Sequence, residues 1–165
     1  MIEREQAQVL RRSALVEAVR RALPDAGGVW IVGGAVRDAL LGEEVRDLDL
    51  AVAGDPEPPA RAIAAELGGH AVELSAEFGT WRVVSRDRGW QVALAARRGE
   101  SIEQDLAARD FTIGAVAVPL HAGPALDPHA GLADLEARLL REVGERSFLD
   151  DPLRLLRAAR LAAQL

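Results

Sequence analysis

The chain contains no cysteine, and all twenty of its basic residues are arginines, so lysine is missing as well. The absence of cysteine excludes a disulfide framework and a thiolate metal site. Arginine without lysine, in a chain rich in alanine, is typical of a GC-rich genome and needs no functional explanation. The three histidines, His70, His121 and His129, share no metal-ligand spacing, so we assign them no metal chemistry.

A net positive charge and a long apolar run are also missing. The formal net charge is −6, which argues against a strong, self-sufficient nucleic-acid binder, because such proteins are usually basic. Any contact with RNA must therefore come from a local patch or from chain outside this sequence. The charged N-terminus has no signal-peptide pattern, and no apolar run approaches a membrane span. We therefore expect a soluble, cytoplasmic protein that makes no contact with a membrane.

The sequence instead carries a mixture of short apolar strands and amphipathic helices, with 49% hydrophobic residues in a chain of 165. This length suits one domain and the start of a second. Strands and helices alternate up to residue 126, and residues 127–165 are mostly helical. We expect helices over residues 4–23, 35–41, 60–67, 133–139 and 151–165, and strands over residues 29–32, 47–52, 71–74, 80–85, 90–94 and 111–118. A further short helix is expected to begin with a capping box at Ser101 and to run through Ala107 or Ala108. Residues 86–89 are expected to form a hairpin turn.

The last expected helix ends without a cap, and its leucines need a partner. Pro152 suits its first turn, and Leu153, Leu156 and Leu161 fall on one side. We expect this apolar face to contact a second copy of the chain or a separate C-terminal partner. The chain therefore resembles the first part of something larger, although a naturally short protein is the alternative.

The most informative feature is Asp47-Leu48-Asp49, at the start of an expected strand. Side chains alternate between the two faces of a strand, so Asp47 and Asp49 point the same way while Leu48 points into the core. Two carboxylates about 7 Å apart on one face can share hard cations such as Mg²⁺. The alternative is a pair of solvated charges at the end of a strand.

Gly33-Gly34 precede this strand, between the expected strand 29–32 and helix 35–41. A glycine pair lets backbone N–H groups approach an anion at a helix start, and it also suits a tight turn. Arg37 in the first turn is placed to contact phosphate, unless it is a surface arginine, and Asp38 is expected to face elsewhere and brace the helix start. A phosphate site beside a metal site is the layout that nucleotidyl transfer needs.

Five motifs then occur in order over nearly the whole chain, and together they resemble one family. That family is the class II tRNA nucleotidyltransferases, which comprises the CCA-adding enzymes and the bacterial poly(A) polymerases, within the DNA polymerase beta-type nucleotidyltransferase superfamily. The resemblance covers the head of these enzymes and the start of their neck. The motifs are Gly33-Gly34-x-Val36-Arg37-Asp38; Arg46-Asp47-Leu48-Asp49; Asp105-Leu106-x-x-Arg109-Asp110-Phe111-Thr112-Ile113; Asp127-Pro128 with Gly131-Leu132-x-Asp134-Leu135 and Leu140-Arg141; and Phe148-x-Asp150-Asp151-Pro152-x-Arg154-x-Leu156-Arg157-Ala158-x-Arg160.

The resemblance implies an α/β (α+β) fold, a mixed sheet flanked by helices. It implies a nucleotidyltransferase head over residues 1–126, with the helix over residues 4–23 at its N-terminus. Residues 127–165 would be the end of the head and the start of a helical neck. The body and tail of the family are absent from this sequence.

The resemblance also implies an enzyme that transfers CMP or AMP, or both, from CTP or ATP to the 3′ end of an RNA, with tRNA as the expected acceptor. Mg²⁺ would be the cofactor, held by Asp47 and Asp49 as metal-binding and catalytic residues. The implied nucleotide-binding residues are Gly33, Gly34 and Arg37 at the triphosphate, Arg109 and Asp110 at the ribose, Asp151 and Arg154 at the base edge, and Arg157 on the same helix.

Simpler roles stay open for several of these residues. Arg109 and Asp110 are equally consistent with a salt bridge at a helix-to-strand junction. Asp151 also suits the acidic first turn of a helix. Arg157 and Arg160 are also compatible with solvated or structural arginines.

The chain departs from the family pattern at Gln91, Ala96, Ala108 and Gly114. Gln91 stands where the family usually has a third catalytic acid, and a neutral amide cannot accept a proton or strengthen a metal site. A degenerate, non-catalytic nucleotide-binding head or interaction module is therefore the alternative function. A small nucleotidyltransferase acting on a protein or an antibiotic is a third possibility, against which the base-selecting pair Asp151 and Arg154 argues.

Overall fold

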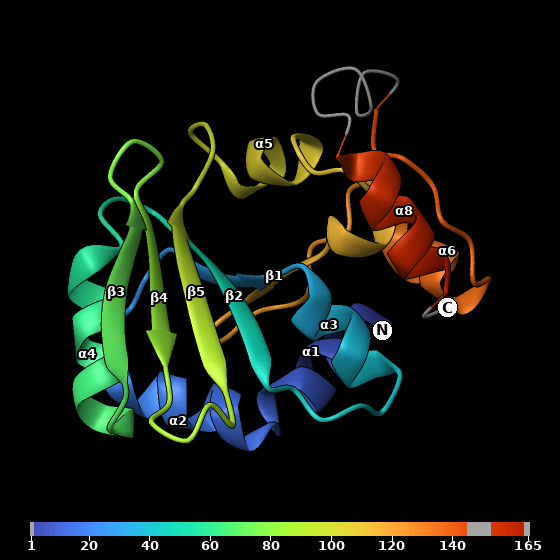
Figure 1. Ribbon diagram of the computed structural model, residues 1–165. Coiled ribbons are helices and arrows are strands. Elements are labelled where there is room, and N and C mark those ends of the chain that lie inside the picture. Colours follow the sequence, from blue (N-terminus) through green and yellow to red (C-terminus); the bar gives the residue numbers. More distant parts are fainter. Residues whose placement is uncertain (1, 145–152, 164–165) are drawn as a thin grey trace.

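The computed structural model describes residues 2–144 and 153–163 of the chain (Figure 1). Its centre is a six-stranded sheet with the strand order β3-β4-β5-β2-β1-β6. Strands β2 and β5 are parallel, and every other neighbouring pair is antiparallel. The expected mixed sheet flanked by helices is therefore confirmed. Across the described ranges, no helix is long and apolar enough to cross a membrane.

The strands match the expected positions closely, with one exception described below. The hairpin around residues 86–89 is confirmed by the antiparallel pairing of β4 with β5. The strand bounds are β1 Val29–Val32, β2 Asp47–Val52, β3 His70–Ser75, β4 Thr80–Val84, β5 Gln91–Ala96 and β6 Ala117–Pro119.

Helices lie around the sheet, and α6 and α8 lie together at the end opposite β3 and α4 (Figure 1). The start of α5 is confirmed, because the hydroxyl of Ser101 accepts a hydrogen bond from the Gln104 backbone N–H at 3.3 Å. The helix bounds are α1 Ile2–Arg11, α2 Ala14–Ala22, α3 Gly34–Leu40, α4 Glu57–Leu67, α5 Ile102–Ala107, the 3₁₀ turn η1 Thr112–Gly114, α6 Gly131–Glu136 and α8 Arg154–Ala162.

Alternation along β2 separates the core from the functional face. Leu48 and Leu50 are 1% and 2% exposed and belong to the main apolar core with residues of α2 and α4. Asp47 and Asp49 on the opposite face are exposed. Because every second side chain of a strand shares a face, the buried leucines hold both acids on the other side of the sheet.

The expected helix over residues 4–23 is wrong in one respect, because it is two helices. Ser13 adopts an extended backbone (φ −62°, ψ 133°) between α1 and α2, and serine favours this position just before a helix. Helix α4 begins at Glu57 instead of Ala60. Its prolines at 58 and 59 fall in the first turn, where proline's missing N–H costs nothing.

The expected strand over residues 111–118 is confirmed only at its end and is wrong for residues 111–116. Thr112–Gly114 form the turn η1, and only Ala117–Pro119 join the sheet. The Thr112 N–H donates to the Arg141 carbonyl at 2.9 Å, and its hydroxyl donates to Asp134 at 2.7 Å. These tertiary bonds direct Thr112 away from the sheet and toward α6.

Helix α6 lies so close to η1 that only glycine fits at its first position. A Cβ at residue 131 would lie 2.0 Å from the Thr112 carbonyl oxygen. The Asp127 carboxylate accepts the N–H groups of Gly131 and Leu132 at 2.7 and 2.9 Å. These contacts, together with those of Asp134 and Arg141, attach α6 to η1. The fourth sequence motif, which contains all of these residues except Thr112, therefore has a structural role.

Helix α8 packs against the rest of the chain through only part of its apolar surface. Leu161 is 8% exposed and packs with Phe111, Ile113 and Leu135, so the expectation that it needs an external partner is wrong. Leu153 and Leu156 are 66% and 71% exposed. The expected helix start at residues 151–152 lies outside the described residues, and the division of the chain at residue 126 stays a prediction.

Replacing Asp134 with Asn should destabilise the fold. Asp134 is 6% exposed and accepts hydrogen bonds from Arg141 and Thr112. Losing a buried, charge-assisted network should lower the free energy of unfolding by about 2 kcal/mol at pH 7. Urea denaturation measures this loss, with Asp25→Asn in an exposed turn as the control.

The same comparison has a definite pH dependence. Hydrogen bonds from Arg141, followed by that from Thr112, lower the pKa of Asp134 below its ordinary 3.8 against the opposing effect of desolvation. Stability from this carboxylate is therefore present above that value and is lost as the pH falls through the lowered pKa. The difference between wild type and Asp134→Asn should shrink in acid; a constant difference would contradict this account.

Candidate active site

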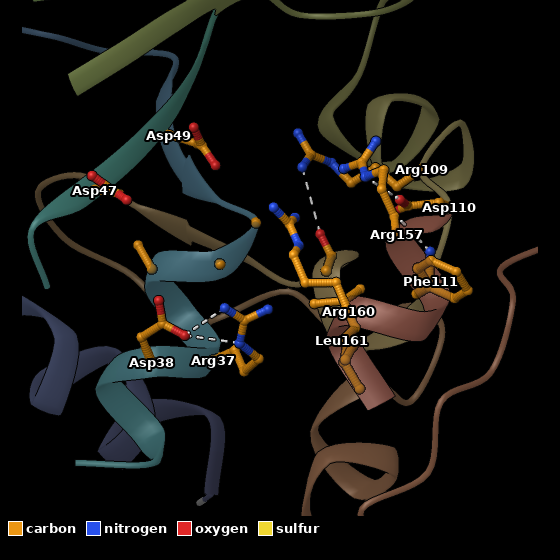
Figure 2. Close-up of a pocket in the computed structure, with 15 residues that line it drawn as sticks. Arg37, Asp38, Asp47, Asp49, Arg109, Asp110, Phe111, Arg157, Arg160 and Leu161 are labelled. Atoms are coloured by element: carbon orange, nitrogen blue, oxygen red, sulfur yellow. Dashed lines mark hydrogen bonds and ion pairs between the residues drawn. The ribbon is translucent and has the colours of Figure 1, made fainter. Parts of the chain in front are cut away.

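A cavity of about 350 Å³ opens between the β2–α3 region and the η1–α8 region (Figure 2). This volume falls within the range of about 300–1,000 Å³ that is usual for ligand sites. Its lining brings together residues far apart in sequence: Gly33, Gly34, Ala35, Arg37, Asp38, Asp47, Asp49, Arg109, Asp110, Phe111, Ile113, Gly114, Arg157, Arg160 and Leu161.

One wall of the cavity is acidic. Figure 2 shows Asp47 and Asp49 on β2, across the cavity from Arg109, Arg157 and Arg160. Gly33 has a left-handed backbone (φ 72°), and a Cβ there would lie 2.9 Å from Oδ2 of Asp49. Glycine is therefore required at residue 33 for two reasons, the backbone conformation and the space that Asp49 occupies.

The Asp49 carboxylate is the electrostatically costly group of the site. Desolvation raises its pKa above the ordinary 3.8, and the charge of Asp47 adds to this effect. Arg109 opposes the rise most strongly, followed by Arg82 and Arg157. A desolvated carboxylate beside a second carboxylate is the setting in which a divalent cation is most stabilising.

The donor set fits a hard cation such as Mg²⁺, because it consists of carboxylate oxygens on one face of one strand. Within residues 2–144 and 153–163, no group of three or more potential ligand side chains surrounds a metal position. Asp47 and Asp49 would therefore share the ion with oxygens that the substrate and water provide.

Arg37 is held at the cavity by its neighbour. Its Nε and Nη2 lie 2.8 and 2.6 Å from Oδ1 of Asp38, and Nη2 lies 3.3 Å from the position of a Cβ on Gly34. The expectation that Asp38 faces elsewhere is wrong, since it lines the cavity beside Arg37. Asp38 thus orients the guanidinium over the glycine turn.

Arg109 is held by an acid that the sequence analysis did not single out. Asp105 is 4% exposed, and its Oδ2 accepts hydrogen bonds from Nε and Nη2 of Arg109 at 3.1 and 2.8 Å. Nη1 of Arg109 reaches the Gly114 carbonyl at 3.5 Å. The spacing of four residues was the available signal, because Asp105 lies on α5 and Arg109 follows just after its end, where such a spacing still places two side chains near each other.

Arg109 and Asp110 both line the cavity, but they do not pair with each other there. Asp110 instead forms an ion pair with Arg157 at 3.1 Å, and its Oδ1 accepts the Phe111 N–H at 3.0 Å. Arg160 also lines the cavity, although the sequence analysis gave it no binding role. Its spacing of three residues from Arg157 on α8 was the signal for a shared face.

Of the two residues expected to select the base, Asp151 and Arg154, the structure describes only Arg154. Arg154 does not line the cavity, and its Nη2 donates to the Ala108 carbonyl at 3.2 Å. Asp151 lies outside the described residues. The base-reading role of these two residues therefore stays a prediction.

Strand β5 places neutral side chains beside both acids. In the parallel register, Gln91 pairs with Asp47 and Ala93 pairs with Asp49. Residues two apart share a face, so both positions lie on the acidic side of the sheet. The neighbour of the desolvated Asp49 is thus Ala93, a position that the sequence analysis overlooked.

The sequence pattern of a known protein family covers most of this chain. The family model of the poly(A) polymerase head domain matches residues 29–141. The chain belongs to this family. The match contains the first four of the five sequence motifs and nearly all of the cavity, with only the residues of α8 beyond it.

Relatives of this head domain carry names from tRNA maturation. The CC-adding tRNA nucleotidyltransferase of Geobacter sulfurreducens is 45% identical over 138 residues, which cover 84% of this chain and 32% of that protein. The A-adding tRNA nucleotidyltransferase of Deinococcus radiodurans is 43% identical over 139 residues, covering 84% and 31%. The chain thus spans about a third of the length of these relatives.

Solved structures share the fold of the head domain. A CCA-adding enzyme in complex with CTP gives a TM-score of 0.79 at 32% identity, with 93% of this chain and 40% of that chain covered. The Thermotoga maritima CCA-adding enzyme complexed with tRNA gives 0.78 at 32% identity, covering 93% and 39%. The family that the sequence motifs indicated is therefore confirmed.

Asp49→Asn should stabilise the head domain while it removes one of the two carboxylates that could bind a cation. A carboxyl with a raised pKa contributes stability below its ordinary 3.8 and loses it as the pH rises through the raised value. Removing the charge should therefore raise the free energy of unfolding at pH 7, but only slightly, because solvent screens a side chain that is exposed. The gain should vanish in acid, which thermal denaturation without added metal can follow.

Added Mg²⁺ should then reverse the order of stability. A ligand that binds only the folded state raises the melting temperature, so wild type should gain and Asp49→Asn should gain less. Asp25→Asn in an exposed turn removes the same charge and should respond like wild type. Equal Mg²⁺ responses for Asp49→Asn and Asp25→Asn would argue against metal binding at Asp49.

Proposed function

We propose that this chain is the catalytic head of an Mg²⁺-dependent nucleotidyltransferase that adds CMP or AMP, or both, to the 3′ end of an RNA. The observation that carries the proposal is the opposition of Asp47 and Asp49 to a wall of arginines across one cavity. This arrangement offers carboxylates to cations and guanidinium groups to phosphates on two sides of the same space. Nucleotidyl transfer requires both.

The triphosphate would lie along Gly33, Gly34, Arg37 and Arg109. Arg37 and Arg109 are oriented by Asp38 and Asp105, so little side-chain entropy is lost when phosphate binds. Guanidinium groups donate two hydrogen bonds in a fixed plane, which matches phosphate oxygens. Gly33 leaves space for Asp49 beside the phosphates.

Asp47 and Asp49 would hold the Mg²⁺. When bound, the ion supplies Lewis-acid stabilisation of charge on the reacting phosphate. In the reaction, the RNA 3′-hydroxyl loses its proton to water and its oxygen bonds to the α-phosphorus, the bond from that phosphorus to the oxygen bridging to the β-phosphate breaks, and pyrophosphate leaves with that oxygen. Arg109, Arg157 and Arg160, which lie across the cavity from the two acids, would stabilise the charge on the departing pyrophosphate.

The nucleoside would extend toward α5 and α8. Arg109 and Asp110 are proposed to contact the ribose, and the Arg157 ion pair fixes the orientation of Asp110. Asp151 and Arg154 are proposed to read the base edge, because a carboxylate accepts from an exocyclic amino group and a guanidinium donates to ring acceptors. Such readout selects CTP or ATP without a template.

The proposed acceptor is tRNA. Relatives named for CC addition and A addition to tRNA support this choice, as do solved relatives in complexes with CTP, with ATP and with tRNA. We also propose a cytoplasmic location, where tRNA matures.

We propose further that residues 1–126 form the head and that residues 127–165 lead into a helical neck. Leu153, just before α8, and Leu155 and Leu156 in its first turn are 66%, 57% and 71% exposed. Contiguous exposed leucines mark an interaction surface. A second copy of the chain or a separate C-terminal partner would cover them.

A degenerate head that binds nucleotides without catalysis is the second candidate. The observation that favours it is the pair of neutral side chains on β5, Gln91 beside Asp47 and Ala93 beside Asp49. Without a third carboxylate, the face has less charge for cations and no further proton acceptor.

Asp47→Asn and Asp49→Asn should each lower the incorporation of labelled CMP or AMP into tRNA by more than about a hundred-fold. Calorimetry with CTP or ATP should show that Mg²⁺ strengthens binding to wild type much more than to either variant. Asp25→Asn should behave like wild type. A variant that carries both Asp47→Asn and Asp49→Asn should lose this effect of Mg²⁺. Nucleotide binding that still depends on Mg²⁺ in this double variant would contradict the proposal.

Carboxylates on β5 separate the two candidates. Ala93→Asp should raise incorporation about ten-fold or more, and should exceed the effect of Gln91→Glu, because residue 93 neighbours the desolvated Asp49. Measurable incorporation by wild type supports the first candidate. Incorporation that appears only in Ala93→Asp or Gln91→Glu supports the degenerate head.

A further inference from the structure

The half of the sheet formed by β3, β4 and β5 has one covered and one open face. Trp81 and Val83 on β4 are buried in the main core, and Arg61 of α4 lies 5.3 Å from the Trp81 ring centroid. That face therefore belongs to the helices. No helix crosses the near side of the three strands in Figure 1, and alternation places Arg82 on that open side.

Arg82 lies in line with the catalytic acids. The strand registers pair Val72 with Arg82, Arg82 with Ala93, and Ala93 with Asp49. With about 4.8 Å between neighbouring strands, the Cα atoms of Arg82 and Asp49 are about 10 Å apart. Only the methyl group of Ala93 stands between them in this row, so nothing large separates the guanidinium from the acid.

Arg82 forms no hydrogen bond or ion pair among the residues that the structure describes, and its charge acts on Asp49 only from a distance. Its Nε is buried without a hydrogen bond, and no ion pair or hydrogen bond is formed by its other nitrogens. Three of the four arginines that line the cavity differ, since Arg37, Arg109 and Arg157 are each paired with an acid, whereas Arg160 forms no ion pair with a described residue. A guanidinium left unpaired beside an acidic centre is suited to an anionic ligand.

The direction of the reaction says which anion approaches this face. The attacking and leaving oxygens of a phosphoryl transfer lie roughly in line on opposite sides of phosphorus. If the triphosphate occupies the arginine-lined cavity, the attacking hydroxyl must arrive from the other side of Asp47 and Asp49. That side is the open face of β5 and β4, and Arg82 does not line the cavity.

We propose that Arg82 binds a backbone phosphate of the acceptor RNA and that the open face of β3–β5 guides the RNA 3′ end to the acids. This inference rests on the proposed function. It places the acceptor RNA strand outside the cavity in which the nucleotide is proposed to bind. Val72 and Leu74, 51% and 50% exposed on β3, continue the face beyond Arg82. They offer aliphatic surface against which ribose or base rings can pack.

The occupant is an RNA strand and not a protein, because the face combines one unpaired guanidinium with a position behind the reacting centre. The chain as a whole carries a net charge of −6. Binding should therefore be local, weak and strongly dependent on salt.

Arg82→Gln tests the assignment, with Arg86→Gln in the exposed β4–β5 turn as a control of equal charge. Fluorescence anisotropy of a short, 5′-labelled single-stranded RNA should show affinity about five- to ten-fold weaker for Arg82→Gln at low salt. The slope of log affinity against log salt should fall by about 0.7, the value for one phosphate contact to a single strand. Arg82→Lys should recover part of the loss, and Arg86→Gln should match wild type.

Calorimetry with CTP or ATP and Mg²⁺ on the same proteins keeps this inference separate from the proposed function. Arg82→Gln should bind nucleotide like wild type. Equal RNA affinities for Arg82→Gln and Arg86→Gln, no RNA binding by wild type at low salt, or a loss confined to nucleotide binding would each overturn the role of Arg82. Failure of wild type to bind nucleotide would instead refute the proposed function.

Discussion

The proximity of the two carboxylates of Asp47 and Asp49 on one face of β2 is the constraint on which the site depends. Alternation along β2 places both acids opposite the buried Leu48 and Leu50, and Gly33 leaves the space that Asp49 occupies. Desolvation and the neighbouring Asp47 oppose ionisation of Asp49. Ionised Asp49 is therefore electrostatically unfavourable in the folded protein. Nearby arginines reduce this unfavourable energy, and a bound cation would reduce it further.

The arrangement of arginines reconciles an acidic chain with an anionic ligand. Arg37, Arg109 and Arg157 are each oriented by a carboxylate of their own, from Asp38, Asp105 and Asp110 respectively. These acids neutralise the arginines in the overall charge count but still direct guanidinium groups into the cavity. A net charge of −6 is thus compatible with a local positive wall. Arg82 forms no hydrogen bond or ion pair with a described acid and does not line this cavity, although its charge acts on Asp49.

The sequence was sufficient for those parts of the site that follow from local rules. Alternation predicted the shared face of Asp47 and Asp49, and the glycine pair predicted the turn before α3 that brings Arg37 to the cavity. The motif order indicated the family, which the match over residues 29–141 confirmed. Ser101 was recognised at the start of α5 because capping is a local property.

Other features depend on tertiary contacts that no local pattern encodes. Thr112 leaves the expected strand because Asp134 and Arg141 bond to it. The importance of Ala93 follows only from the register of β5 against β2, which depends on how the two strands pair across the sheet. Asp105 was visible as a helical neighbour of Arg109, but its burial was not.

The most direct test of the central claim is the position of a bound metal. Mn²⁺ can replace Mg²⁺, and it broadens the NMR signals of nearby backbone amides. With CTP or ATP present, the account predicts selective loss of the signals from Asp47–Asp49, Gly33 and Gly34, while the far strand β3 stays sharp. Broadening centred elsewhere, or none at concentrations that saturate nucleotide binding, would contradict it.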